Sequence, residues 1–253
     1  MSGRGEGAVT GERPLPTERP LVTGARPLPT ERPLVTGARP LPTVRPLGIV
    51  SVAFGRDCPL SEAARRAQSL GFDHLDIATD RMDGSGKPLA LAVGDRNGPV
   101  PQTGCTCRLP PGCTWEQCVA LLRRQPELRV EPGPRSVLDS AAAIRAMCQE
   151  VPCLRITLDT GWAAFGGYDP LEVADLAGHV QLRQARPGHA QVHPDEEGDV
   201  DFAAVIDGLE ALGYEGLFSV EYFDLPELGL PLADPVGHCV DLAARVRPLL
   251  AAG

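Results

Sequence analysis

The sequence lacks three features that mark whole classes of protein. It has no apolar run longer than a strand, so no segment is predicted to cross a membrane. It has a net charge of −9 and no basic stripe beyond residue 46, which argues against a nucleic-acid surface. Its N-terminus carries Arg and Glu without the apolar stretch of a secretory signal. We therefore expect a cytoplasmic protein that binds neither membranes nor nucleic acids.

Paired zinc-binding cysteines are missing as well, although the chain has eight Cys residues. Half of them lie close together in TGCTCRLPPGCTWEQC, but their spacing differs from the C-x-x-C pairs of structural zinc sites. These four are Cys105, Cys107, Cys113 and Cys118. We expect reduced thiols, with Cys148, Cys153 and Cys239 as small buried hydrophobes.

The first 49 residues contain three copies of a 13-residue unit, which begin at Gly11, Gly24 and Gly37. Its prolines favour polyproline II and its apolar residues are too sparse for a core, so residues 1–46 are predicted to form a disordered arm. The segment RPLPTERP has the spacing of a PxxP ligand for a partner domain. A repeat expansion without a role is favoured, because the unit has no apolar face.

Residues 47–253 are long enough and apolar enough for one α/β domain, since the chain is 43% hydrophobic. Short β-branched runs alternate with helical patterns, most regularly from residue 114 onward. Strands are expected at 47–54, 74–79, 89–93, 105–109, 127–132, 154–159, 179–184 and 217–222. Helices are expected at 61–70, 114–125, 136–150, 169–177, 201–212 and 234–250. This order predicts a compact (β/α)₈ barrel that is partly shortened in its first half.

Four oxygen-bearing side chains follow the same pattern in the second half of the chain. Each lies at the carboxyl end of a predicted strand, in ELRVEP, LRITLD, HVQLRQ and LFSVEY. They are Glu131, Asp159, Gln181 and Glu221. In a closed barrel the carboxyl ends of the strands converge, and three carboxylates with one amide oxygen suit Mn²⁺ or Mg²⁺ better than zinc. The pattern predicts a shared metal site.

These motifs carry a resemblance to a known family. The chain has RVEP at 129–132, LDTGW at 158–162, HVQLRQARPG at 179–188, GDVDFAAVIDGLEALGYEG at 198–216 and SVEY at 219–222. It resembles the xylose isomerase-like TIM barrel superfamily of sugar and sugar phosphate isomerases and epimerases, most strongly after residue 128. Two positions depart from the family pattern. Trp162 stands where the family usually has the histidine of D-T-G-H, and Gln181 replaces a metal-ligating histidine.

The resemblance implies a role for each matching residue. Glu131 and Glu221 would bind the metal and transfer a proton beside a carbonyl, and Asp159 would be a ligand only. Trp162 would form an apolar wall against the sugar. The remaining candidates for substrate contact are His179, Arg183, Arg186 and His193, of which the two arginines can clamp a phosphate or carboxylate. His179 can also be a packed histidine one layer below the site.

The implied activity is a metal-dependent isomerase or epimerase of a sugar, polyol or sugar phosphate that works through an enediolate. An inosose-dehydratase-like lyase needs the same first step and stays open. A barrel that has lost part of its metal site and no longer catalyses is the third possibility. The apurinic endonucleases of the family are disfavoured, because they use more histidines than the five present here and a basic surface. A homo-oligomer is possible, since the last helix and the EYFDLPELGLPL loop are apolar enough to pack on a neighbour or on the barrel.

Overall fold

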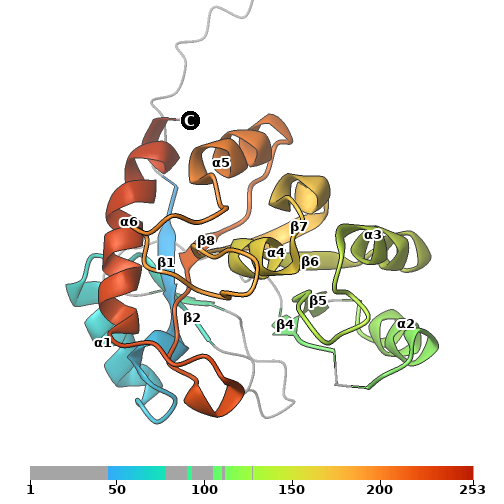
Figure 1. Ribbon diagram of the computed structural model, residues 1–253, viewed down its shortest axis with the longest axis horizontal. Coiled ribbons are helices and arrows are strands. Elements are labelled where there is room, and N and C mark those ends of the chain that lie inside the picture. The colour runs from blue at the N-terminus through green and yellow to red at the C-terminus, as the bar shows by residue number, and fades with distance from the viewer. Residues whose placement is uncertain (1–44, 78–89, 93–104, 110–111, 127, 253) are drawn as a thin grey trace, which may run out of the picture. The chain divides into compact units, whose positions relative to one another are not determined.

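The computed structural model describes residues 45–77, 90–92, 105–109, 112–126 and 128–252 (Figure 1). These residues belong to one compact unit. The predicted N-terminal arm lies outside the described residues except for its last two positions, so it stays a prediction. Arg45, at one of these positions, donates a hydrogen bond from Nη1 to the carbonyl oxygen of Tyr214 at 2.6 Å.

The described strands form one curved sheet in the order β3-β2-β1-β8-β7-β6-β5-β4. The strands are β1 (Leu47–Val50), β2 (His74–Asp76), β3 (Ala90–Ala92), β4 (Cys105–Cys107), β5 (Leu128–Val130), β6 (Arg155–Asp159), β7 (Ala177–Leu182) and β8 (Phe218–Val220). Every neighbouring pair is parallel except β2 and β3, which are antiparallel. Strand β1 pairs with β8, the pairing of first and last strands that a (β/α)₈ barrel requires. The predicted barrel fold is therefore confirmed, with an irregular first half.

Helices cover the outer side of the sheet (Figure 1). They are α1 (Leu60–Ser69), α2 (Trp115–Arg124), α3 (Ala141–Glu150), α5 (Phe202–Ala211) and α6 (Pro235–Ala252). Helix α4 (Thr160–Gly166) instead follows β6 directly and lies in the middle of the view in Figure 1. Three short 3₁₀ helices are η1 (Ser51–Phe54), η3 (Pro170–Leu176) and η4 (Pro226–Leu228). Helix α1 packs against β2, and α6 packs against β1 and β8. The last helix thus covers its own barrel.

Side-chain caps set where several helices begin. Thr114 and Gln117 form a capping box at the start of α2. The hydroxyl of Ser140 accepts from the amide of Ala143 at 3.4 Å, and α3 begins directly after it. Because a cap satisfies amides that lack a partner in the first turn, Ser140 fixes that boundary. The predicted helix at 136–150 was therefore five residues too long at its start.

One further element prediction was wrong, and one helix was missed. The apolar run at 47–54 is not one strand, because β1 ends at Val50 and the next four residues form η1. All of η1 is buried, so its sequence shows no periodicity that distinguishes a strand from a helical turn. Helix α4 was not expected, and Asp159 caps it by accepting from the amides of Gly161 at 2.7 Å and Trp162 at 3.2 Å.

Polar side chains cross the inside of the curved sheet. His179 on β7 bonds to Asp76 on β2 at 2.6 Å, although β1 and β8 lie between these strands. Thr106 on β4 likewise meets Thr157 on β6 at 2.6 Å across β5. All four of these side chains are buried. The apolar core lies on the other side, between sheet and helices.

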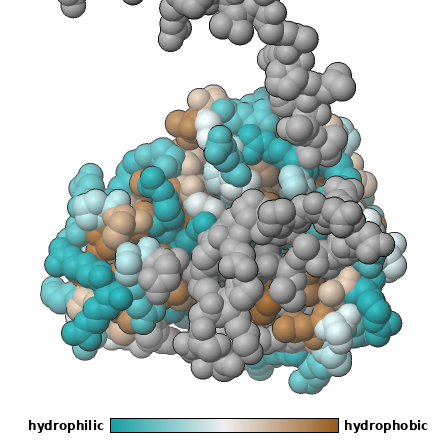
Figure 2. All heavy atoms as spheres, turned by 180° about the vertical axis from the view of Figure 1, so that it is seen from behind, coloured by the Kyte–Doolittle hydropathy of each residue, from teal (hydrophilic) through white to brown (hydrophobic). Residues whose placement is uncertain are grey.

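The face seen in Figure 2 has hydrophilic side chains along much of its described edge and apolar ones in smaller groups. The large apolar side chains exposed among the described residues are Leu70, Leu171 and Leu212. None of the helices in the described part of the chain combines the length and apolarity needed to cross a bilayer.

The described cysteines are free thiols, and Cys148 and Cys239 are buried as expected. Cys153 is exposed, contrary to expectation, because it lies in the turn that joins α3 to β6.

Candidate metal centre

Three carboxylates meet at the carboxyl end of the barrel. Glu131 and Glu221 directly follow β5 and β8, and Asp159 is the last residue of β6. One oxygen from each lies within 4.8 Å of the other two. All three side chains are buried, with at most 7% of each residue exposed. The convergence predicted for Glu131, Asp159 and Glu221 is therefore present in the geometry.

Gln181 shares this end of the sheet. It stands directly opposite Asp159 in the register of β6 and β7 and is 6% exposed. Its Oε1 is buried and has no hydrogen-bond partner among the described residues, and the same is true of Oε2 of Glu221. A buried acceptor without a partner is costly. Two such oxygens beside a carboxylate cluster are what a bound cation would satisfy, so the residues fit a hard divalent ion.

Two guanidinium groups also reach the carboxylates. Arg183 donates from Nη2 to Oδ2 of Asp159, and Arg108 donates from Nη2 to Oε1 of Glu131. Arg183 was a candidate for substrate binding, whereas Arg108 was missed by the sequence reasoning. Its position directly after β4 was the available signal, because it matches the position of Glu131 after β5. Arg108 is half-exposed, but Arg183 is fully buried.

Trp162 joins two of the acids. Its indole Nε1 donates to Oε1 of Glu131 at 3.0 Å, and its backbone amide donates to Asp159. The indole therefore lies against the carboxylates. Its expected role as an apolar wall against the sugar stays a prediction. The guanidinium carbons of Arg183 and Arg108 lie 4.6 Å and 5.2 Å from its ring centroid. Both distances allow a cation–π interaction.

Burial and crowding of charge perturb the site. Burial raises the pKa of Glu221 well above its ordinary value, and the negative charges of Asp159 and Glu131 raise it further. Burial also raises the pKa of Asp159, although Arg183 opposes this. For Arg108, burial is the largest single effect and lowers the pKa, but the charges of Glu131, Glu221 and Asp159 and the hydrogen bond to Glu131 together raise it overall. Without a cation, the cluster favours a proton on one of its carboxyl groups.

His179 lies one layer below the carboxylates. It is two residues before Gln181 on β7, and its Nε2 is bonded to Asp76. His74 contributes to the same layer, because its Nε2 lies 3.1 Å from Oγ of Ser219 and 3.5 Å from Asp76. The packed position considered for His179 is the one found. Its predicted role in substrate binding stays untested.

Arg186 and His193 are the other two predicted substrate contacts. Among the described residues, no hydrogen bond or ion pair links either of them to the carboxylate cluster. Arg186 lies in the loop after β7 and donates to the carbonyl oxygen of Glu197 at 3.2 Å. His193 faces α6, where its Nε2 lies 3.2 Å from Asp241. Its ring packs edge-on against His238 with centroids 4.6 Å apart. Their substrate roles stay predictions.

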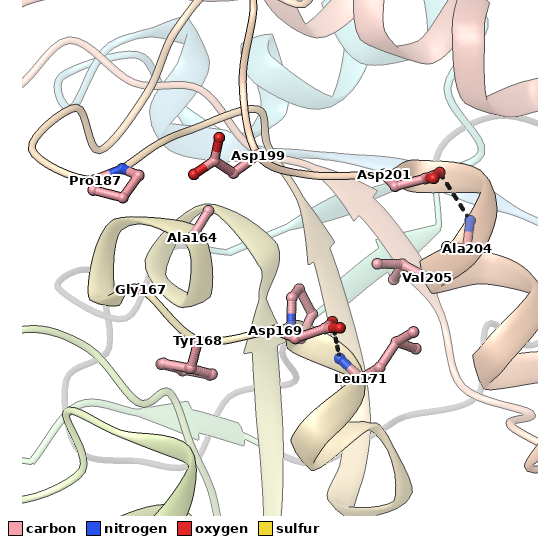
Figure 3. A pocket seen from close by; sticks show the side chains of 11 residues that line it. Ala164, Gly167, Tyr168, Asp169, Leu171, Pro187, Asp199, Asp201, Ala204 and Val205 are labelled. Atoms are coloured by element: carbon pink, nitrogen blue, oxygen red, sulfur yellow. Dashed lines mark hydrogen bonds between the residues drawn. The ribbon is translucent and has the colours of Figure 1, made fainter.

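A separate hollow of about 380 Å³ lies beside α4, η3 and the start of α5 (Figure 3). Tyr168, Asp199, Asp201 and Pro187 are among the residues that line it, but none of the clustered carboxylates is. Asp169 and Asp201 at its edge act as helix caps, with bonds to Leu171 and Ala204. This hollow is therefore distinct from the carboxylate cluster.

The fold and the cluster together define a β/α barrel with an acidic, cation-compatible centre at the carboxyl end of its strands. The family described as xylose isomerase-like TIM barrel matches residues 60–238. The chain belongs to this family. By sequence alone, no curated protein matches it.

Solved structures of sugar epimerases have a similar fold. A 3-keto-D-glucoside 4-epimerase from E. coli is 18% identical with a TM-score of 0.55, covering 81% of this chain and 99% of its own. An L-ribulose 3-epimerase is 18% identical with a TM-score of 0.57, covering 82% and 95%. A D-allulose 3-epimerase from Methylomonas sp., solved with D-allulose, is 15% identical with a TM-score of 0.56, covering 81% and 98%. At this identity the likeness concerns the fold.

Proposed function

We propose that the protein is a metal-dependent isomerase or epimerase of a sugar, polyol or sugar phosphate. The observation that carries this proposal is the buried meeting of Glu131, Asp159 and Glu221 at one end of the barrel. Family membership and the similarity to three sugar epimerases support it. The reaction would transfer a proton at a carbon beside a carbonyl, through an enediolate.

The proposed cation is Mn²⁺ or Mg²⁺, held by Glu131, Asp159, Gln181 and Glu221. An all-oxygen set matches these ions by ligand type. When bound, the cation would polarise the substrate carbonyl. The unpartnered Oε1 of Gln181 and Oε2 of Glu221 support the ligand assignment most directly.

Glu131 and Glu221 are the proposed proton-transfer groups, one on each face of the substrate. Trp162 orients Glu131 through its indole N–H and excludes water from one side of that carboxylate. Burial that raises the pKa of Glu221 moves this group toward the working range of a general base or acid. Arg108 would have to release Glu131 for it to act, which its half-exposed position permits.

Proton exchange tests this proposal directly. Wild type and Glu221→Gln are incubated in D₂O with Mn²⁺ and a set of ketoses, 3-keto-glucosides and inososes, and deuterium at the substrate carbons is measured by NMR. Since a positioned base contributes about 10²- to 10⁴-fold, exchange should fall by at least about 100-fold in the variant. Glu227→Gln changes an acid that is paired with Arg56 at the surface, so it serves as the control and should exchange like wild type. Absence of exchange by the wild type on every substrate would refute the proposed activity.

Two other functions fit particular observations. A lyase shares the proton abstraction, and the same NMR experiment separates it by the appearance of a dehydrated product. A non-catalytic barrel is favoured by the Trp162 and Gln181 departures and by the guanidinium groups on two of the acids. Metal analysis separates this last case, because an enzyme of the proposed kind holds about one divalent ion per chain after reconstitution.

A further inference from the structure

Arg183 places a fixed positive charge in the candidate metal centre. Its side chain is fully buried, and its Nη2 bonds to Oδ2 of Asp159. Its guanidinium carbon lies 4.6 Å from the centroid of Trp162 and 4.7 Å from that of Phe223. Its backbone is tied to Thr160 by hydrogen bonds of 2.9 and 3.0 Å. These contacts hold the guanidinium against Asp159.

Both oxygens of Asp159 are already engaged. Oδ1 accepts from the amides of Gly161 and Trp162, and Oδ2 accepts from Arg183. An ion that used Oδ2 of Asp159 as a ligand would have to share this oxygen with the buried guanidinium of Arg183 or displace it. By contrast, Oε1 of Gln181 and Oε2 of Glu221 have no partner among the described residues. The donors of the cluster are therefore unequal.

The charges of the cluster also indicate that its donors are unequal. Arg183 and Arg108 together carry the positive charge of one divalent cation, and each is bonded to a different carboxylate. Arg108 is 46% exposed and can move into solvent, whereas Arg183 is 0% exposed and has no room to leave. Gly161 shows how tightly it is enclosed, because a Cβ there would lie 2.3 Å from Nε of Arg183. Of the two arginines, Arg183 is therefore the one that always competes with a divalent ion for a carboxylate.

We propose that Arg183 sets the metal affinity of this centre by competing with a divalent ion for Asp159, so that Asp159 is the weakest of the four proposed ligands. Arg183 is a positioning residue in this role, because it acts on the ion through Asp159. The proposal rests on the metal site of the proposed function. Its consequence is that removing the guanidinium charge frees a third carboxylate and tightens the binding of Mn²⁺.

The test measures the dissociation constant of Mn²⁺ alone, by isothermal titration calorimetry and by the EPR signal of free Mn²⁺. Arg183→Met keeps an unbranched apolar stem between the two rings and should lower the dissociation constant at least tenfold. Arg183→Lys keeps the positive charge and should stay within about threefold of wild type. The control is Arg145→Met, which removes a surface arginine paired with Asp175 at 2.7 Å and should change nothing.

Far-UV circular dichroism would reveal misfolding of Arg183→Met. Variants at other positions keep the proposal testable in that case. Asp159→Asn should alter the affinity of otherwise wild-type protein by less than about threefold, since Asp159 is already occupied, whereas Glu221→Gln should weaken it at least tenfold. Equal or weaker binding by folded Arg183→Met would overturn the proposal, as would a large loss in Asp159→Asn. Neither outcome depends on sugar turnover, so a failure here differs from a failure of the proton-exchange experiment.

Discussion

The environment of Glu221 combines burial with two neighbouring negative charges. Its Oε2 has no partner among the described residues, and burial, Asp159 and Glu131 all raise its pKa above the ordinary 4.5. A carboxyl group with a raised pKa in the folded state binds its proton more tightly there than in the unfolded chain. Its contribution to stability is therefore complete below pH 4.5 and is lost as the pH rises through the folded-state pKa.

Glu221→Gln should consequently stabilise the metal-free protein at neutral pH. The amide has nearly the same shape and carries no charge, so the variant lacks the loss of stability that the wild type undergoes as pH rises above 4.5. Urea unfolding in EDTA at pH 5 and pH 8 checks this. The free energy of unfolding of the variant, minus that of the wild type, should be larger at pH 8. A difference that shrinks with pH would mean that Glu221 is stabilised in its charged form.

Much of the site at the residue level was predictable from the sequence. Glu131, Asp159 and Glu221 each lie at or directly after the end of a recognisable strand, and strand ends of a barrel converge. Gln181 lies one residue before the end of β7. Arg108 was not found, because the sequence around it shows no periodicity and the strand before it is short. The sequence left two positions open for His179, in the site or packed one layer below it, and the structure bonds it to Asp76.

At the scale of elements, the junction of β6 and α4 positions most of the centre. Asp159 ends the strand, caps the helix and bonds to Arg183, and the first turn of α4 supplies Trp162. No helix was expected between the predicted strand at 154–159 and the predicted helix at 169–177, although an aspartate is a common helix cap. The strand at 47–54 failed for another reason, since both faces of η1 are buried and no periodicity shows.

Gly161→Ala tests how tightly this junction is packed. The added Cβ would lie 2.3 Å from Nε of the fully buried Arg183, so the variant should lose about 1–3 kcal/mol of unfolding free energy. Gly133→Ala is the matched control, because its Cβ would meet only Trp162 at 3.9 Å. It should stay within about 0.5 kcal/mol of wild type. Equal stabilities of the two variants in urea would show that Arg183 is free to move aside.

At the scale of the whole molecule, a ligand of the native state must raise the melting temperature. Mn²⁺ at about 100 times its dissociation constant adds roughly 2.7 kcal/mol of stability. For a domain of this size, that corresponds to about 5–10 °C. The melting temperature of wild type with and without Mn²⁺ should differ by this amount, and that of Glu131→Gln combined with Glu221→Gln should barely change. An equal shift in both proteins would place the ion elsewhere.

The order of strands was predictable in outline, because alternating β and α patterns imply a parallel barrel. The antiparallel β3 was not, since its short apolar run carries no direction. The polar layer inside the barrel was equally hidden. Ser219 on β8 is distant in sequence from His74 and Asp76 on β2, and only the pairing of both strands with β1 brings them together.

The polar layer inside the barrel also requires a residue without a side chain beside His74. Gly48 on β1 stands opposite His74 in the register of the sheet, and a Cβ at position 48 would lie 2.2 Å from Nε2 of this histidine. Substitutions at these two positions can therefore occur in one order only during evolution. Residue 48 can acquire a side chain only after residue 74 has become smaller, so a lineage that keeps the imidazole also keeps the glycine beside it.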